Sequence, residues 1–137
     1  MPNPDIENLP GFLPAETEIF KRWVNETVPS AERWQYNVRV GLGTKPPPSF
    51  ETNYARMVEM LSKPRIDVVA HRGEKVELIE IKVNAGPSAV GQLLMYRTLY
   101  EKSFGAGTVS SLLLLTDNIR PDTKGLAESH NVTYIVV

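Results

Sequence analysis

The sequence of 137 residues contains no cysteine. A fold held together by disulfides is therefore excluded, and so is a metal site built from thiolates. Proteins that remain in a reducing compartment, or inside a virus particle, commonly lack disulfides. We therefore predict a cytoplasmic or virion-associated protein that is not secreted.

Long apolar runs and a strong net charge are also absent. No apolar run approaches the roughly 20 residues of a membrane-spanning helix, so no contact with a membrane is expected. The first five residues have neither the basic cluster nor the apolar stretch of a secretion signal. The formal net charge is -1, whereas isolated nucleic-acid binders are usually basic. This balance disfavours tight, independent DNA binding and favours weak contact, DNA presented by a partner, or a basic face offset by acids elsewhere.

What the chain does contain is the composition of a globular domain, with 42% hydrophobic and 23% charged residues. We expect one domain at residues 15–137, preceded by an extended arm at residues 1–14 that has prolines at positions 2, 4, 10 and 14. Two interpretations of the arm stay open: a disordered tail, or a segment that docks on a neighbouring subunit in an oligomer or larger complex. We predict that Phe12 and Leu13 pack on the first helix, while Met1 to Leu9 reaches a partner subunit or stays mobile.

Hydrophobic periodicity divides the domain into four helices and five strands. The helices are expected at residues 15–27, 50–62, 89–104 and 122–130, and the strands at 34–40, 65–70, 76–83, 111–116 and 132–137. Alternation in the first strand places four apolar side chains on one side: Trp34, Tyr36, Val38 and Val40. Four consecutive leucines at 112–115 predict a strand buried on both faces, and the last two strands should be parallel because a helix joins them. The order α-β-α-β-β-α-β-α-β is that of an α/β fold with a mixed sheet flanked by helices.

Three charged residues interrupt two of the apolar strands. Asp67 lies in the run from 65 to 70, and Glu80 and Lys82 lie in the run from 76 to 83. Residues two apart on a strand share a face, so Glu80 and Lys82 point the same way. The alternate residues point the other way, into a core: Ile79, Ile81 and Val83. A buried charge is costly unless it is paired or binds a metal. If the Asp67 strand lies alongside, two carboxylates converge with an ammonium, and a divalent cation would relieve the repulsion.

These residues resemble the signature of the PD-(D/E)xK nuclease superfamily. Asp67 and Glu80-Ile81-Lys82 correspond to its acidic positions and its lysine, and Pro64 corresponds to its proline, although Pro64 is not adjacent to Asp67. The segment Gln92-Leu93-Leu94-Met95-Tyr96 resembles the Q-x-x-x-Y helix motif of the RecB-like branch. As an order of elements, the resemblance covers residues 12–137.

The resemblance implies a restriction-endonuclease-like fold and a Mg²⁺-dependent nuclease that hydrolyses phosphodiester bonds in DNA. Mn²⁺ should be able to replace Mg²⁺. The metal would be held by Asp67, Glu80 and the backbone carbonyl of Ile81. Members of the family often supply a further glutamate from the first helix, which here would be Glu16.

The resemblance also assigns roles to the remaining polar residues of the motifs. Lys82 would orient or deprotonate the attacking water, or stabilise the charged oxygens of the transition state. Gln92 and Tyr96 are one helical turn apart and therefore share a face. They complete the catalytic set and would contact a ligand carboxylate or a DNA phosphate.

Other interpretations of the same residues stay open. Glu80 and Lys82 could form an ion pair on a half-exposed strand, which would contribute little. Asp67 could be an ordinary acid at a strand end, and Tyr96 could be a core aromatic. The whole fold could serve as a non-enzymatic assembly subunit, for example in a phage particle or a multiprotein DNA machine. The intact charged set favours chemistry, and a nucleotide-binding domain is disfavoured because the chain has no glycine-rich strand-to-helix turn.

Overall fold

The computed structural model describes residues 2–4, 6, 9, 11–43, 47–49, 51–61 and 63–137. Along the chain the elements are α1 (Pro14–Thr27), β1 (Arg33–Arg39), α2 (Thr52–Leu61), β2 (Arg65–Arg72), β3 (Lys75–Lys82), α3 (Pro87–Phe104), β4 (Val109–Thr116), α4 (Pro121–Ser129) and β5 (Val132–Val136). This is the predicted order, and each predicted bound lies within two residues of the observed one. Phe50 and Ser62, the predicted ends of the second helix, lie outside the described residues. No helix of the described chain is both long enough and apolar enough to cross a membrane.

The five strands form one mixed sheet in the order β1-β2-β3-β4-β5. β1 pairs antiparallel with β2, and β2 with β3, which it joins through a short turn at Gly73 with a φ of 64°. β3 pairs parallel with β4, and β4 with β5, since α3 and α4 carry the chain back between them. The predictions of a mixed sheet flanked by helices and of parallel final strands are therefore confirmed.

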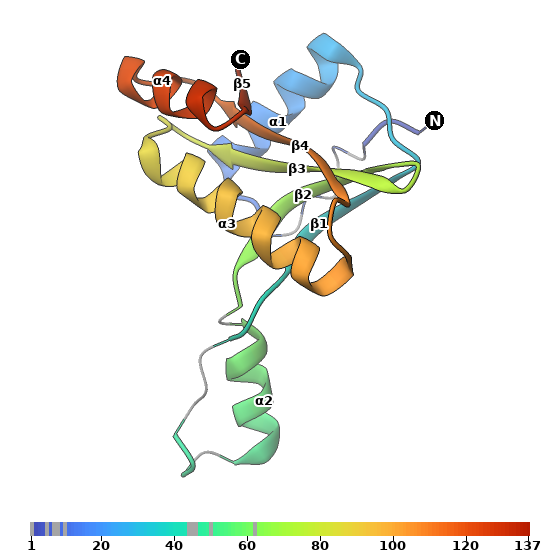
Figure 1. The fold of residues 1–137 in the computed structure, drawn as a ribbon, viewed down its shortest axis with the longest axis vertical. Helices are drawn as coiled ribbons and strands as arrows, with labels where there is room; N and C mark the ends of the chain where they lie inside the picture. Colours follow the sequence, from blue (N-terminus) through green and yellow to red (C-terminus); the bar gives the residue numbers. More distant parts are fainter. Residues whose placement is uncertain are drawn as a thin grey trace.

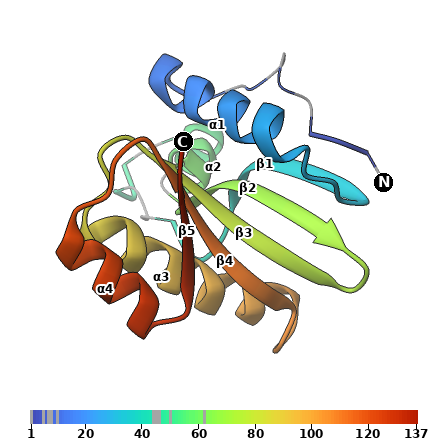
Figure 2. The ribbon, with the colours of Figure 1, turned by 90° about the horizontal axis from the view of Figure 1, so that it is seen from above.

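The sheet separates two hydrophobic cores. α1 covers one face, and α3 and α4 cover the other, as Figure 2 shows from above. Phe20 and Trp23 of α1 share a core with Leu113, whereas Leu93 of α3 shares the opposite core with Leu114. Neighbouring leucines of β4 thus face opposite cores, which confirms the prediction of a strand buried on both faces.

Side chains of β3 follow their predicted alternation along most of the strand. Ile79 and Ile81 face the α1 core, whereas Leu78 faces the α3 core. Val83 lies beyond the end of β3 and is 40% exposed. The prediction that Val83 points into a core is therefore wrong, because the strand ends at Lys82 and the chain turns there.

The alternation in β1 changes face at Asn37. Trp34 and Tyr36 pack on the α1 side, whereas Val38 and Val40 pack on the α3 side. The prediction that these four side chains share one face is therefore wrong. The physical reason is the backbone of Asn37, whose φ of 54° interrupts the extended conformation on which alternation depends.

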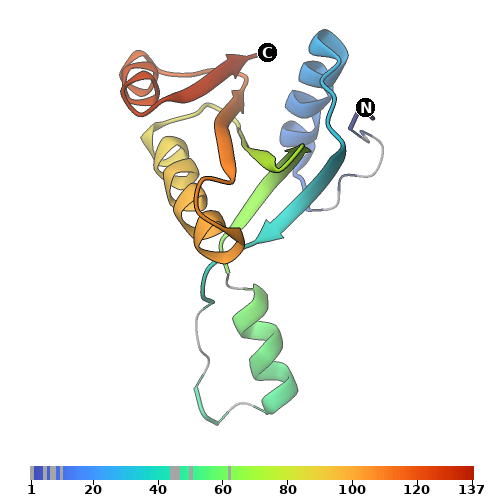
Figure 3. The ribbon, with the colours of Figure 1, turned by 45° about the vertical axis from the view of Figure 1, so that its right-hand side comes forward.

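α2 stands apart from the sandwich, at the tip of the connection between β1 and β2 (Figure 1 and Figure 3). Its apolar spacing correctly predicted a helix. Two of its large side chains, Tyr54 and Met57, are nevertheless 51% and 50% exposed. Helical periodicity here identified the element, although the sheet does not bury that face.

The N-terminal arm docks on its own domain at the described positions near its start. The carbonyl oxygen of Pro2 accepts hydrogen bonds from the Ala31 amide and the Trp34 indole, both at 3.1 Å. Pro4 is buried. The prediction that Met1 to Leu9 reaches a partner subunit or stays mobile is therefore wrong for these prolines. Several other arm residues lie outside the described residues: Met1, Asp5, Glu7, Asn8 and Pro10.

The end of the arm packs on the core beneath α1. The Phe12 ring meets Phe20 edge-on, with 6.0 Å between the ring centroids, which confirms the prediction for Phe12. Ile6 and Leu9 contact the same core. Leu13 occupies the N-cap position of α1 and is 66% exposed, so the prediction that it packs on the helix is wrong.

Candidate functional site

The hairpin of β2 and β3 opens into a fork at the end opposite its turn. Its register pairs Val68 with Ile79, and one step further along this antiparallel pair Asp67 lies opposite Glu80. Beyond that point β2 comes from the α2 connection and β3 leads on to α3, so the two strands separate (Figure 1). The side of the fork that carries Leu78 is covered by α3. The two predicted acids therefore lie where two strands and a helix meet.

The carboxyl groups of Asp67 and Glu80 at the fork are buried and interact with each other. Asp67 and Glu80 are each 6% exposed, and their side chains share a hydrogen bond. The Ile81 amide donates to Oδ2 of Asp67 at 2.9 Å. From α3, the Tyr96 hydroxyl lies beside the Glu80 carboxyl and acts on its pKa as a hydrogen-bond donor. Residues from three elements are thus brought into one polar cluster, in which Tyr96 is both a core aromatic and a partner of Glu80.

This arrangement changes the protonation of the pair. Burial raises the pKa of Glu80 to about 9, and the neighbouring Asp67 charge adds to the rise. Burial also raises the pKa of Asp67, against smaller lowering effects of its hydrogen bonds to Glu80 and Ile81. For Tyr96, burial and then the two acids raise the pKa of the hydroxyl. Near neutral pH the pair therefore retains a proton, because two carboxylates this close cannot both ionise at low cost.

Two buried side-chain oxygens have no hydrogen-bond partner among the described residues: Oε2 of Glu80, and Oε1 of Gln92 one helical turn before Tyr96 on α3. A buried acceptor without a partner costs about 1–3 kcal/mol. Both residues lie on the side of the sheet that α3 covers, one on β3 and the other on α3 itself. Oε2 of Glu80 therefore has lone pairs available for a cation or a water molecule.

Two cations border the pair. Nη2 of Arg65 lies 4.0 Å from Oδ1 of Asp67, which is charge contact but not a hydrogen bond. Lys82 is exposed at the end of β3, and its positive charge opposes the rise in the Glu80 pKa. The ammonium has no carboxylate within 4.0 Å in the described part of the chain. The predicted same-face arrangement of Glu80 and Lys82 is thus present without a close ion pair.

Glu16 lies at the start of α1, where its Oε1 accepts the Leu13 amide at 2.8 Å. Its charge contributes to the raised pKa of Asp67. Among the described residues no three histidine, aspartate or glutamate side chains lie close enough together to hold a metal ion. The acidic donors of the cluster are therefore Asp67 and Glu80. A metal role for Glu16 stays a prediction, and it would require the side chain to leave the Leu13 amide.

Asn37 belongs to this region, although the sequence interpretation did not single it out. The register pairs Tyr36 with Val68 and Val38 with Ile66, which places Asn37 opposite Asp67. The left-handed backbone of Asn37 therefore occurs beside the candidate site. Asparagine is one of the few residues that tolerates this conformation, so an asparagine inside an alternating strand was the available signal.

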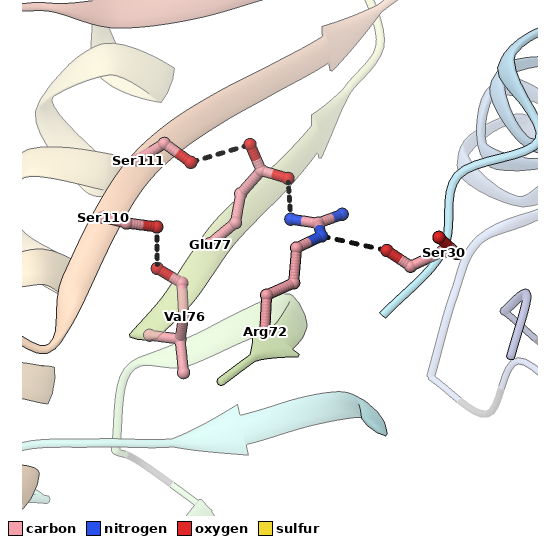
Figure 4. A network of polar contacts seen from close by, with 6 residues as sticks. All are labelled: Ser30, Arg72, Val76, Glu77, Ser110 and Ser111. Carbon is pink, nitrogen blue, oxygen red and sulfur yellow. Dashed lines mark hydrogen bonds and ion pairs between the residues drawn. The ribbon is translucent and has the colours of Figure 1, made fainter. Parts of the chain in front are cut away.

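A second polar cluster lies at the other end of the hairpin (Figure 4). Glu77 accepts from Arg72 at 3.0 Å and from the Ser111 hydroxyl at 2.8 Å. Arg72 also donates to the Ser30 carbonyl at 2.9 Å and lies over the Trp34 ring. These groups partner one another across β2, β3 and β4, so this cluster serves to hold the sheet together.

Removing Glu77 is expected to destabilise the fold without affecting any activity of the fork. Glu77→Ala leaves Arg72 and Ser111 without their acceptor, which should lower the free energy of unfolding by about 1–2 kcal/mol. Urea denaturation would measure the loss. A change within a few tenths of a kcal/mol would contradict a structural role for the cluster.

A groove lies beside the C-terminal end of β1. It has a volume of about 340 Å³ and is lined by Gly41, Leu42, Leu99, Lys102 and Ser103. None of the predicted site residues lines it. The candidate site therefore rests on the buried carboxyl pair and not on this groove.

Comparison with known proteins yields structural neighbours only. No family model matches the chain, and no curated protein matches it. A repair endonuclease from Pyrococcus abyssi is similar with a TM-score of 0.57 and 15% identity, covering 92% of this chain and 48% of that one. EndoMS in complex with double-stranded DNA is similar with a TM-score of 0.53 and 17% identity, covering 98% and 48%. A protein from Vibrio cholerae is similar with a TM-score of 0.52 and 16% identity, covering 88% of this chain and 29% of that one.

These likenesses establish a fold shared with endonucleases of known structure. The chain spans about half the length of the first two neighbours. The narrower assignment to a RecB-like branch, and the helix motif from Gln92 to Tyr96, stay predictions.

Proposed function

We propose that this chain is a metal-dependent nuclease domain that hydrolyses phosphodiester bonds in DNA. The observation that carries the proposal is the buried pair of Asp67 and Glu80, which retains a proton and leaves Oε2 of Glu80 without a partner. A buried acidic pair of this kind is costly unless a cation compensates it. Support for DNA as the substrate comes from the shared fold with a repair endonuclease and with a DNA-bound EndoMS.

The residues at the fork fit a hard divalent cation. Carboxylate and carbonyl oxygens are the ligands of Mg²⁺ and Mn²⁺. Asp67, Glu80 and the Ile81 carbonyl would hold the ion, with the unpartnered Oε2 of Glu80 as the free donor. When bound, such an ion would lower the pKa of its bound water and offset charge on the phosphate.

The side chains around the pair would prepare the reaction. Tyr96 holds the Glu80 carboxyl through its hydroxyl, and the Ile81 amide holds Asp67. Lys82, exposed beside Glu80, would orient the attacking water or stabilise the charge that develops on the phosphate oxygens. Gln92 would use its unpartnered Oε1 to hold a water molecule in place.

A cleavage assay tests the proposal directly. We expect the purified chain to nick or degrade labelled single-stranded or double-stranded DNA with Mg²⁺ or Mn²⁺, and to do neither with EDTA. RNA of the same sequence serves as the comparison substrate. Absence of cleavage on every substrate, in protein that melts cooperatively and fails to bind Mn²⁺, would overturn the proposal and favour a non-enzymatic assembly subunit.

A further inference from the structure

In both β1 and β2 the side chains change the face of the sheet on which they pack at the candidate site. Asn37 has a φ of 54° and lies opposite Asp67, between the pairs that Tyr36 and Val38 make with β2. In β2 the burial also changes face here, since Ile66 packs with the α3 core and Val68 with the α1 core. Residues other than glycine seldom adopt this backbone conformation inside a strand, although asparagine tolerates it, and such positions often occur at functional sites. The irregular backbone of Asn37 thus lies directly beside the candidate site.

Arg65 lies next to this irregularity, two residues before Asp67. Its side chain is 34% exposed, and the carboxylate of Asp67 is 4.0 Å away. At 4.0 Å the two groups attract each other without forming a hydrogen bond. The guanidinium lies at the edge of the buried pair, partly open to solvent and partly neutralised. A planar guanidinium in this position matches a phosphate group, which it can bind with two parallel hydrogen bonds.

The N-terminal arm packs against the Arg65 side chain at Gly11. Gly11 has a φ of 81°, and a Cβ atom there would lie 3.0 Å from Nδ2 of Asn37 and 3.1 Å from Nη1 of Arg65. The arm backbone therefore lies directly against both side chains, and any residue other than glycine would be strained and would displace them. The next residue, Phe12, anchors the arm through ring contacts with Phe20 and Tyr36.

We propose that Arg65 binds a phosphate of the nucleic-acid backbone beside the one that is cleaved, and that Gly11 and Asn37 hold its guanidinium in place. This inference rests on the proposed nuclease function. The net charge of -1 means that attraction to DNA must come from local cations at the site. Contacts to the backbone position a substrate without reading its sequence, so Arg65 should affect affinity for all DNA sequences alike.

DNA binding, measured by fluorescence anisotropy with Ca²⁺ in place of Mg²⁺ over a series of salt concentrations, tests the inference. Arg65→Gln should weaken binding about tenfold. It should also reduce the slope of log Kd against log salt concentration by about one, because one phosphate contact is lost. Arg65→Lys should restore the slope and only part of the affinity. Arg22→Gln is the matched control, since Arg22 is exposed on α1 and pairs with Glu18 at 3.5 Å.

Gly11→Ala tests the support from the arm. We expect weaker DNA binding and a smaller salt slope, with Arg65 still present and with cooperative melting retained. A purely structural role for Gly11 would lower the melting temperature and leave the salt slope unchanged. That outcome would overturn the positioning role.

The outcomes separate this inference from the proposed function. A wild-type chain that binds DNA and does not cleave it contradicts the nuclease proposal, while the salt slopes still decide the role of Arg65. A wild-type chain that cleaves DNA, with affinity and slope unchanged in Arg65→Gln, overturns the inference alone. A wild-type chain that does not bind DNA overturns both. If Arg65→Gln does not fold, the slope of log Kd against log salt concentration in Gly11→Ala decides whether Arg65 contacts a phosphate.

Discussion

Replacing Asp67 with alanine is expected to lower the rate of DNA cleavage by at least about a thousandfold, the scale of loss when an indispensable catalytic group is removed. Asp67 is buried between Glu80 and the Ile81 amide. Glu16, the further acid whose charge acts on Asp67, already accepts the Leu13 amide. No adjacent carboxylate is therefore placed to replace Asp67 without rearrangement. The measurement is the single-turnover rate on labelled duplex DNA with saturating Mn²⁺.

Asp67→Asn is the matched variant, because it keeps the side-chain volume and an acceptor for the Ile81 amide while removing the charge. We expect the same loss of rate, together with loss of Mn²⁺ binding by calorimetry and retention of cooperative unfolding. Glu77→Gln, in the polar cluster at the other end of the hairpin, should keep the wild-type rate. Cleavage by Asp67→Ala within about tenfold of the wild-type rate would point to a contaminating nuclease or another site.

Replacing Glu80 with glutamine should make the metal-free protein more stable at alkaline pH. The pKa of Glu80 rises from 4.5 to about 9 on folding. Between those values the native state holds a proton that the unfolded chain releases, so the free energy of unfolding falls as the pH rises. The slope from this one group is at most about 1.4 kcal/mol per pH unit. Glutamine stays neutral, keeps an acceptor for Tyr96 and a donor for Asp67, and removes that slope.

Urea denaturation in EDTA at pH 5, 7 and 9 measures this effect. The two proteins should have similar stability near pH 5, and the variant should be more stable at pH 9 by a margin on the order of a few kcal/mol. Added Mn²⁺ should then stabilise the wild-type protein and not the variant, because binding to the native state alone raises its stability. Parallel pH profiles for the two proteins would show that Glu80 is ionised without the metal, and the shared-proton description of the pair would have to be abandoned.

Local patterns predicted the elements well, and the departures have identifiable causes. The register of β2 and β3 follows from a two-residue alternation on either side of Gly73, and it brings Asp67 opposite Glu80. The alternation in β1 failed because a single residue, Asn37, leaves the extended conformation. Asn37 adopts this backbone conformation where it lies opposite Asp67 of β2 and next to Gly11 of the arm. Neither Asp67 nor Gly11 is near Asn37 in the chain.

The sequence by itself determined the order of helices and strands, the mixed sheet, and the spacing that assembles two acids and a lysine at one end of a hairpin. These features depend on periodicity and turn chemistry, which act between residues close in the chain. The tertiary structure alone decided that Glu80 keeps its proton and that the Tyr96 hydroxyl lies beside the Glu80 carboxyl. It also decided that the arm lies against Arg65. Protonation depends on burial and on charges from other elements, and docking depends on which surfaces the packed sheet leaves open. Both are set by residues that only folding brings together.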